Sequence, residues 1–497
     1  MSTLTRRRFI QNTFILGAAT WSARSWGQVA GANSDVRVAV LGLNGRGKNH
    51  LASLAKVPGV RVVALCDPDQ AVLARAVTEF GGGVTAYPDL RELLASKEID
   101  AITIATPNHW HSLAAIWACE AGKDVYVEKP ISHNVWEGRQ LVAAAAKYKR
   151  VVQAGTQIRS GEGMIEAVDW IRSGNLGRIT AARGFCYKRR RSIGLTHGPQ
   201  PIPATADYDL WCGPAPKDPL RRAKLHYDWH WQYVTGNGDV GNQGIHQMDV
   251  ARWFLGEPGL PRHTLSIGGR LGYEDDGDTP NTQVIIHDYA TAPLIFEVRG
   301  LPARAALTGS ADTSGLAGPD AAAAAAGTMD KYRGVSIGNV IDCEGGSLVV
   351  PGYFAATAYD TSGKAIKEFK GTDRHMANFI DVVRSRKTQE LYGDIEQGHV
   401  SSALCHLGNI SHQIGHATLP GETREKIRGN ARLTEAYGRM AEHLALNGVD
   451  LTKTPTTLGV PLTVDGRAER FTGEGEQAAN ALLKRNYRKG YVVPQLA

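Results

Sequence analysis

The stretch VRVAVLGLNGRG, residues 36–47, joins a short apolar run to a glycine-rich turn. The run is typical of a buried parallel strand, and the residues after the turn favour a helix. In such a GxGxxG pattern the glycines permit a tight turn and close helix packing, while free N–H groups at the helix start can hold a pyrophosphate. Asparagine replaces the middle glycine, although it adopts left-handed backbone more readily than most residues. The predicted cofactor-binding residues of this loop are Gly42, Asn44, Gly45, Arg46 and Gly47.

A second apolar run, residues 61–65, leads to Asp67, which lies 25 residues after Gly42. A carboxylate at this place accepts hydrogen bonds from the ribose hydroxyls of a dinucleotide and repels a 2'-phosphate. The sequence therefore favours NAD over NADP as the cofactor. Asp67 could also cap the helix predicted from Pro68 to Phe80, and the two roles are compatible.

Two further predicted strands, residues 101–105 and 124–127, end in polar side chains. Ligands of open α/β sheets bind at the carboxyl ends of the strands, so we expect these side chains to face the cofactor. A lysine beside a glutamate at that edge can be tuned as a proton donor or acceptor, although such a pair is also common at surface loops. The remaining predicted cofactor-binding residues are Thr106, Asn108, His111, Glu128, Lys129 and Gln157.

The segments TPNHWH, residues 106–111, and AGKDVYVEKP, residues 121–130, downstream of a glycine loop resemble the Gfo/Idh/MocA family of glucose–fructose oxidoreductases and inositol dehydrogenases. The resemblance covers nearly all of the chain after residue 32. It implies an α/β protein with an N-terminal Rossmann parallel sheet, followed by an α+β domain. The sheet of that second domain is expected to be open-faced and mostly antiparallel, and to carry the substrate site and a homo-oligomer contact, in a dimer or tetramer.

A second chemical centre is predicted in GNGDVGNQGIHQMD, residues 236–249. The apolar spacing from Ile245 onward favours a helix, which places His246 and Asp249 near one another at positions i and i+3. In the family this place holds an aspartate and, four residues later, a histidine that work with the lysine of EKP. His246 matches that histidine, whereas Asn242 stands where the aspartate is expected. Because an amide cannot take a proton, the catalytic proton transfer should fall on Lys129 and His246.

Aromatic and histidine side chains crowd residues 211–231. Core packing explains some of them, but flat rings with polar tips are also what sugar faces stack against. The basic run at residues 188–191 and the acidic run at residues 274–278 are interpreted as solvated loops, with no metal site. The predicted substrate-binding residues are Tyr227, Trp229, His230 and Asp249.

The N-terminus carries the order of basic, apolar and small residues that is typical of an export signal. Arginines in TRRRFIQ, residues 5–11, precede an apolar segment at residues 14–19 and a small-residue site at residues 30–32, which indicates the twin-arginine type. Periplasmic or secreted localisation is expected, with no membrane anchor after cleavage. Residues 1–32 hold four arginines and no lysine or acid, so the formal charge of +7 falls to +3, and nucleic acid is not an expected partner.

The expected organisation is a signal peptide (1–32), a dinucleotide-binding domain (33–155), a substrate and oligomerisation domain (156–445) and a tail that packs on the body (446–497). Residues 315–327 are interpreted as a low-complexity insertion. Six cysteines without CxxC spacing predict neither zinc nor a dense disulfide framework.

The sequence thus predicts an exported NAD(P)-dependent oxidoreductase that acts on a hydroxyl of a sugar, glycoside or cyclitol and keeps its cofactor tightly bound. An alternative from a different class is an NAD-dependent glycosidase that works by transient C3 oxidation, elimination and hydration. A cofactor-binding protein without enzymatic activity is a third reading, which the presence of Lys129 and His246 disfavours.

Overall fold

The first sheet is parallel throughout and has the strand order β3-β2-β1-β4-β5-β6. The order reverses between β1 and β4, so the turns after these two strands open at a topological switch point. The strands are β1 (Val36–Leu41), β2 (Val60–Cys66), β3 (Thr85–Tyr87), β4 (Ala101–Ile104), β5 (Asp124–Val127) and β6 (Val152–Ala154). The helices between them are α3 (Arg46–Leu54), α4 (Gln70–Phe80), α5 (Leu90–Ala95), α6 (Asn108–Glu120) and α7 (Val135–Tyr148).

These elements belong to a computed structural model that describes residues 35–303 and 329–497. The predicted export signal and the 315–327 insertion therefore lie outside the described residues. Within them, no helix combines the length and apolarity needed to cross a membrane. The six cysteines all lie in the described ranges, and none is joined in a disulfide.

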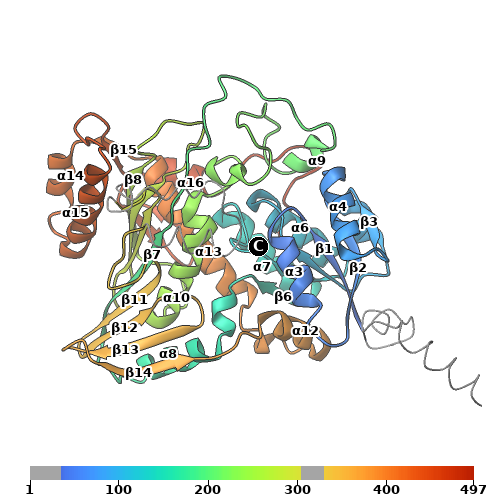
Figure 1. Ribbon diagram of the computed structural model, residues 1–497, viewed down its shortest axis with the longest axis horizontal. Coiled ribbons are helices and arrows are strands. Elements are labelled where there is room, and N and C mark those ends of the chain that lie inside the picture. The colour runs from blue at the N-terminus through green and yellow to red at the C-terminus, as the bar shows by residue number, and fades with distance from the viewer. Residues whose placement is uncertain (1–34, 304–328) are drawn as a thin grey trace, which may run out of the picture.

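The second sheet is mixed and mostly antiparallel, because β7 pairs in parallel with β10 while its other strand pairs run antiparallel. It stands beside the first sheet in Figure 1, which confirms the predicted fold class. Its strands are β7 (Ile179–Tyr187), β8 (His263–Gly269), β9 (Thr282–Asp288), β10 (Leu294–Arg299), β11 (Ile337–Cys343), β12 (Gly346–Val350), β13 (Ala355–Asp360), β14 (Ala365–Lys370), β15 (His416–Thr418), β16 (Thr456–Leu458), β17 (Leu462–Asp465) and β18 (Arg470–Thr472).

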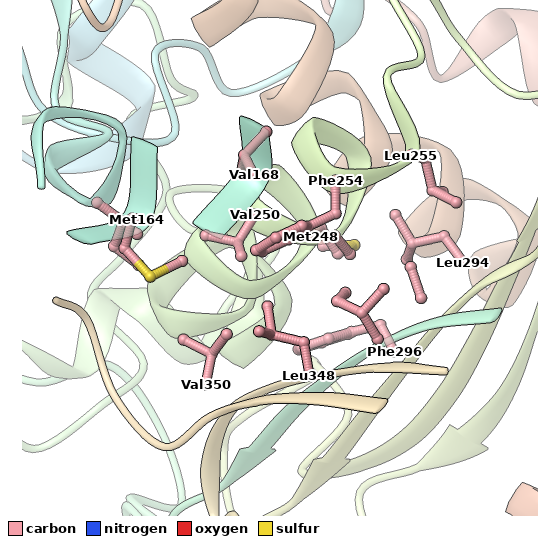
Figure 2. Packing of buried hydrophobic residues seen from close by; sticks show 14 of the residues in the cluster. Met164, Val168, Met248, Val250, Phe254, Leu255, Leu294, Phe296, Leu348 and Val350 are labelled. Carbon is pink, nitrogen blue, oxygen red and sulfur yellow. The ribbon is translucent and has the colours of Figure 1, made fainter. Parts of the chain in front are cut away.

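Helices pack on both faces of this second sheet. Leu294 and Phe296 of β10 belong to the cluster formed with α8 (Glu162–Arg172), α10 (Ile245–Leu255) and α13 (Ile395–Gln413), part of which Figure 2 shows. Ile295 between them joins the opposite cluster, with α14 (Pro420–Ile427) and α15 (Ala431–Leu446). Since successive strand residues point to opposite faces, each face of β10 has its own core.

The chain returns to the first domain after the second sheet is built. Helix α12 (His375–Ser385) adds Phe379 and Ile380 to the core around β1. Past the short helix α16 (Glu476–Ala481), Tyr491 and Val493 pack into the cluster around α6. Strands β16 and β17 of that same C-terminal segment pair with β8, so part of it is integral to the sheet.

Three polar features differ from their sequence interpretation. Arg190 of the basic run is buried against Asp239 rather than solvated. In the acidic run, the Asp275 side chain is fully buried and paired with Arg270. The residue that caps α4 is Asp69 rather than Asp67, and its side chain accepts from the backbone N–H groups of the first helical turn. Only the Arg190–Asp239 pair joins distant parts of the chain, whereas the other two contacts are local.

Removing the ring of Phe296 should destabilise the second domain strongly. This side chain is fully buried between β10 and α10. A Phe296→Ala change should lower the free energy of unfolding by about 3–5 kcal/mol through lost burial and a cavity. The matched control is Ile366→Ala on the edge strand β14, which is 46 % exposed and should change stability by less than about 0.5 kcal/mol. Equal midpoints of denaturant unfolding for the two variants would contradict the described core.

Candidate active site

One pocket opens at the carboxyl edge of the first sheet. It is lined from the Rossmann side by the turn after β1 and by residues that follow β2, β4 and β5. Residues 210–230 of the second domain form the facing wall, and Asn242 closes one end. The predicted site residues that line it are Gly42, Asn44, Gly45, Arg46, Asp67, Thr106, Asn108, His111, Glu128, Lys129, Tyr227, Trp229, His230 and Asn242.

The glycine loop has the shape that a bound pyrophosphate needs. Gly42 has a φ of +84°, and a Cβ there would lie 2.6 Å from the carbonyl oxygen of Ala105. A Cβ on Gly47 would lie 2.0 Å from the carbonyl oxygen of Gly42, so this glycine serves helix packing behind the pocket. Helix α3 starts after Gly45 without a side-chain cap, which leaves its first N–H groups available to an anion. These residues fit a nicotinamide dinucleotide.

Asp67 lies on the pocket wall where β2 ends. Asp67 accepts hydrogen bonds from the backbone N–H groups of Leu43 (2.9 Å) and Asp69 (3.0 Å), and burial raises its pKa. Asn44 accepts from Arg75 Nη2 at 2.7 Å and is not among the residues with positive φ. The middle position of the loop therefore does not require glycine in this chain.

Glu128 lies at the centre of a buried polar cluster. Its Oε1 accepts from Arg46 Nε (2.8 Å) and Gln157 Nε2 (3.1 Å), and lies 3.1 Å from His50 Nε2. Burial acts to raise the pKa of Glu128, but the Arg46 charge and the His50 contact outweigh it and hold the pKa well below its usual range. The predicted cofactor residue Gln157 thus acts from behind, by binding Glu128 and the Tyr126 hydroxyl.

Lys129 is the cation beside this cluster. Its Nζ donates to the backbone carbonyl of Asn242, which ties the edge of the first sheet to the second domain. Asn242 belongs to η3 (Val240–Gly244), a π-helical turn that runs into α10, and such turns are frequent at functional sites. Desolvation lowers the pKa of Lys129, partly offset by the Glu128 charge. A lysine with a lowered pKa is better suited to act as a base near neutral pH.

His246 lies on the first turn of α10, close to Lys129 but not on the pocket wall. Burial and the Lys129 charge lower its pKa to about 3, so the ring is neutral at physiological pH. Its Nδ1 is buried without a hydrogen-bond partner. The ring packs at 5.3 Å from that of Tyr353, whose hydroxyl accepts from Gln243 Nε2 at 2.8 Å.

Tyr353 is a candidate site residue that sequence reasoning missed. It follows β12, is 37 % exposed, and has its pKa raised by burial, so its hydroxyl remains protonated. No motif or spacing connects it with His246, since the two meet only through the pairing of β7, β11 and β12.

The aromatic wall is held in a defined conformation. Tyr227 has a φ of +67°, rare for a residue with a side chain, and its hydroxyl accepts from Arg190 Nη1 at 3.3 Å. The rings of Trp229 and His230 stack at 3.6 Å. His111 lines the pocket on the Rossmann side. Its ring nitrogens lie 2.6 Å and 2.8 Å from the carbonyl oxygens of Pro130 and Thr106, so the ring links the residues that follow β5 and β4.

Asp249 does not reach the pocket, contrary to its prediction as a substrate residue. Its carboxylate accepts two hydrogen bonds of 2.9 Å from Arg159 Nε and one of 2.5 Å from the Ser401 hydroxyl. Arg252 lies 3.8 Å away, and all of these groups are buried. The structure therefore places Asp249 in a buried ion pair of the second domain's core.

An Asp249→Ala change should destabilise the fold. It leaves the guanidinium groups of Arg159 and Arg252 buried without their carboxylate, which typically costs about 3–5 kcal/mol. The control is Asp381→Ala, because Asp381 pairs with Arg374 at 3.4 Å on the surface and should matter by less than about 1 kcal/mol. Denaturant unfolding measures both. Unchanged stability together with weakened sugar binding in Asp249→Ala would restore the substrate role.

Two family models match the chain. Residues 36–156 match the model described as oxidoreductase family, NAD-binding Rossmann fold, and residues 169–269 match its C-terminal alpha/beta domain. Among solved structures, the WlbA dehydrogenase from Bordetella pertussis in complex with NADH and UDP-GlcNAcA aligns over 75 % of this chain and 95 % of its own. The TM-score is 0.53 at 17 % identity, so this likeness concerns the fold.

Curated relatives match over a shorter stretch. A glycosyl hydrolase family 109 protein from Shewanella sp. (strain W3-18-1) is 30 % identical over 161 residues, which is 31 % of this chain and 35 % of that protein. Inositol 2-dehydrogenase 1 from Saccharopolyspora erythraea is 34 % identical over 144 residues, or 29 % and 43 % of the two chains. Each alignment covers less than half of the relative.

Proposed function

The chain is a member of the Gfo/Idh/MocA oxidoreductase family by both its Rossmann and its C-terminal domain, and we propose that it is an exported NAD(P)-dependent enzyme. In this proposal it transfers a hydride from a hydroxyl-bearing carbon of a sugar, glycoside or cyclitol and keeps its cofactor tightly bound. The observation that carries the proposal is the position of Lys129, which lies at the pocket edge beside Glu128 and in contact with Asn242.

In this proposal one residue, Lys129, acts as the base. A bound nicotinamide dinucleotide supplies hydride acceptance. Lys129 takes the proton of the substrate hydroxyl, for which its lowered pKa suits it. His246, neutral because its pKa is about 3, orients the substrate through a ring nitrogen rather than storing the proton. The protonated Tyr353 hydroxyl and the Asn242 side chain are hydrogen-bonding groups for neighbouring substrate hydroxyls.

NAD is the proposed cofactor rather than NADP. Asp67 lies on the pocket wall where β2 ends, and its Oδ1 accepts from the backbone N–H of Asp69. The negative charge of Asp67 opposes a 2'-phosphate, whereas ribose hydroxyls can donate to its carboxylate.

A carbohydrate is the proposed substrate because stacked rings with polar tips form the facing wall of the pocket. Tyr227, Trp229 and His230 supply these rings. The relative from Saccharopolyspora erythraea, an inositol 2-dehydrogenase by name, supports a polyhydroxylated ring as the substrate class.

The alternative is an NAD-dependent glycosidase. It oxidises the sugar C3 hydroxyl, removes the C2 proton that the C3 carbonyl acidifies, eliminates the aglycone from C1, adds water across the C1–C2 double bond and returns the hydride to C3. Asn242, in the place of the family's aspartate, fits this reaction at least as well as net oxidation. The Shewanella relative named as a glycosyl hydrolase also supports this reaction class.

Export through the twin-arginine pathway is part of the proposal and rests on the residues 5–32 pattern. An enzyme outside the cytoplasm has little free NAD to draw on, so its cofactor should be regenerated in place. We also propose a homo-oligomer, on the basis of the family resemblance.

The proposal is tested with purified protein and no added cofactor. Mass analysis of the released small molecules should find NAD, and free sugars should reduce it once, with reoxidation by a second carbonyl substrate. Aryl glycosides that release aglycone without net NADH would establish the glycosidase instead. Lys129→Ala and His246→Ala should each abolish either reaction, while Lys97→Ala, an exposed lysine, should leave it unchanged. A protein that neither contains nor rebinds a dinucleotide would contradict both proposed reactions.

The pH dependence offers a separate check on Lys129. As a base it must be unprotonated, so the rate of reduction of bound cofactor should rise with pH through a pKa below the ordinary 10.5 of lysine. The Glu128 charge holds that pKa up, so Glu128→Gln should move the rising limb to lower pH. Glu92→Gln, an exposed glutamate on α5, is the matched control. A limb that shifts to higher pH in Glu128→Gln would exclude Lys129 as the titrating base.

A further inference from the structure

Residues 199–235 cross the mouth of the pocket, and we call this segment the strap. It includes α9 (Tyr208–Cys212) and η2 (Asp228–Trp231), and Figure 1 shows α9 beside α4 of the first domain. Backbone hydrogen bonds join the strap to the loop before α4. Gln70 N–H donates to the Thr205 carbonyl at 2.9 Å, and Asp207 N–H donates to the Pro68 carbonyl at 3.0 Å.

A buried carboxylate fastens this edge. Asp69 is 4 % exposed; its Oδ1 accepts from the Thr205 hydroxyl at 2.8 Å and its Oδ2 lies 2.9 Å from His226 Nε2. We call these three residues the latch. Two of them come from the strap, and the third is the cap of α4, which is fixed in the Rossmann domain by its bonds to the helix N–H groups. The latch therefore joins a rigid element to a loop segment.

The strap is also a wall of the dinucleotide pocket. The strap residues that line it are Leu210, Trp211, His226, Tyr227, Trp229 and His230. They face the glycine loop and the residues after β4, so a dinucleotide in the pocket would lie between the strap and the sheet edge. A ligand enclosed in this way cannot leave the sheet edge in the direction of the strap unless the strap moves.

The far side of the strap is anchored by the C-terminal tail. Arg488 Nη1 donates to the carbonyls of Asp209 (3.0 Å) and Gly213 (3.1 Å), and the Tyr491 hydroxyl donates to Asp209 Oδ2 at 3.1 Å. Near the other end, Arg485 Nη2 donates to the Val234 carbonyl at 3.0 Å. The tail thus holds residues 209–213 and Val234 of the strap, whereas the side toward α4 is held by the latch and by the two backbone hydrogen bonds to the loop before that helix.

We propose that the strap is a lid that retains the dinucleotide, and that opening of the Asp69–Thr205–His226 latch gates cofactor exchange. The proposal rests on the proposed function for the identity of the ligand. The gate would explain why the dinucleotide stays bound. Its release would require breaking the hydrogen bonds of Thr205 and His226 to the buried Asp69 carboxylate, as well as the contacts of the dinucleotide itself. Because Tyr227 follows the latch histidine directly, the same closure positions the aromatic wall of the substrate site.

The test measures association and dissociation of a fluorescent etheno-NAD analogue by stopped flow, with Thr205→Val/His226→Leu against wild type. This pair removes the strap's half of the latch and leaves Asp69 and the α4 cap intact. A gate limits both directions, so both rate constants should rise by about tenfold or more, while the dissociation constant changes by less than about threefold. His263→Leu is the matched control, since His263, at the exposed start of β8, pairs with the exposed Asp288 at 3.3 Å.

Other outcomes overturn the gate. Unchanged rates would do so, and so would faster dissociation with unchanged association, because that pattern describes only a lost contact between His226 and the ligand. Asp69→Asn is a second variant, which keeps His226 and, since asparagine caps helices well, also keeps the start of α4. It should raise both the association and the dissociation rate constant, and it provides the test if the double variant folds poorly. Wild-type protein that binds no dinucleotide would overturn the proposed function together with the gate, whereas tight binding with latch-independent exchange would overturn the gate alone.

Discussion

The burial of the Glu128 carboxylate is the constraint on which the site depends. A carboxylate removed from water is tolerated only with its hydrogen bonds satisfied, and here the partners come from the start of α3, from within α3 and from beyond β6. A Cβ on Gly155 would lie 2.9 Å from Glu128 Oε2, so the backbone also closes around it. These contacts fix Lys129 at the sheet edge and leave its amine beside a compensating charge.

Several of the polar contacts that join the two domains converge on Asn237. Asn237, just before the π-helical turn, accepts at Oδ1 from Asn108 Nδ2 (3.0 Å) and donates from Nδ2 to the His133 carbonyl (3.0 Å). Its own carbonyl accepts from Asn409 Nδ2 at 3.0 Å. Elements from three distant parts of the chain thereby hold the turn that carries Asn242. Helix α12 and the C-terminal tail also pack on the first domain, and the tail in addition holds the strap.

Elements with strong local signals were predictable. The apolar run that opens at Val36 forms β1, the strand predicted at residues 124–127 matches β5 to the residue, and α10 begins at Ile245 as its apolar spacing indicates. Cap and ion-pair assignments were less predictable, because they depend on which distant group arrives. Asp249 is the clearest case: helical spacing placed it near His246, but Arg159 and Ser401, each far away in the chain, turned its carboxylate into the core.

The glycine loop and the carboxylate after β2 were readable from the sequence, because they depend on local backbone geometry and short spacings. The pairing of Lys129 with His246 was implied only by the family resemblance. Tertiary packing was needed to show that Tyr353 packs on His246, that Arg190 is buried against Asp239, and that strap residues line the pocket. The physical reason is that contacts between residues far apart in the chain, and the burial that sets their charge states, follow from how sheets and helices pack rather than from any local pattern.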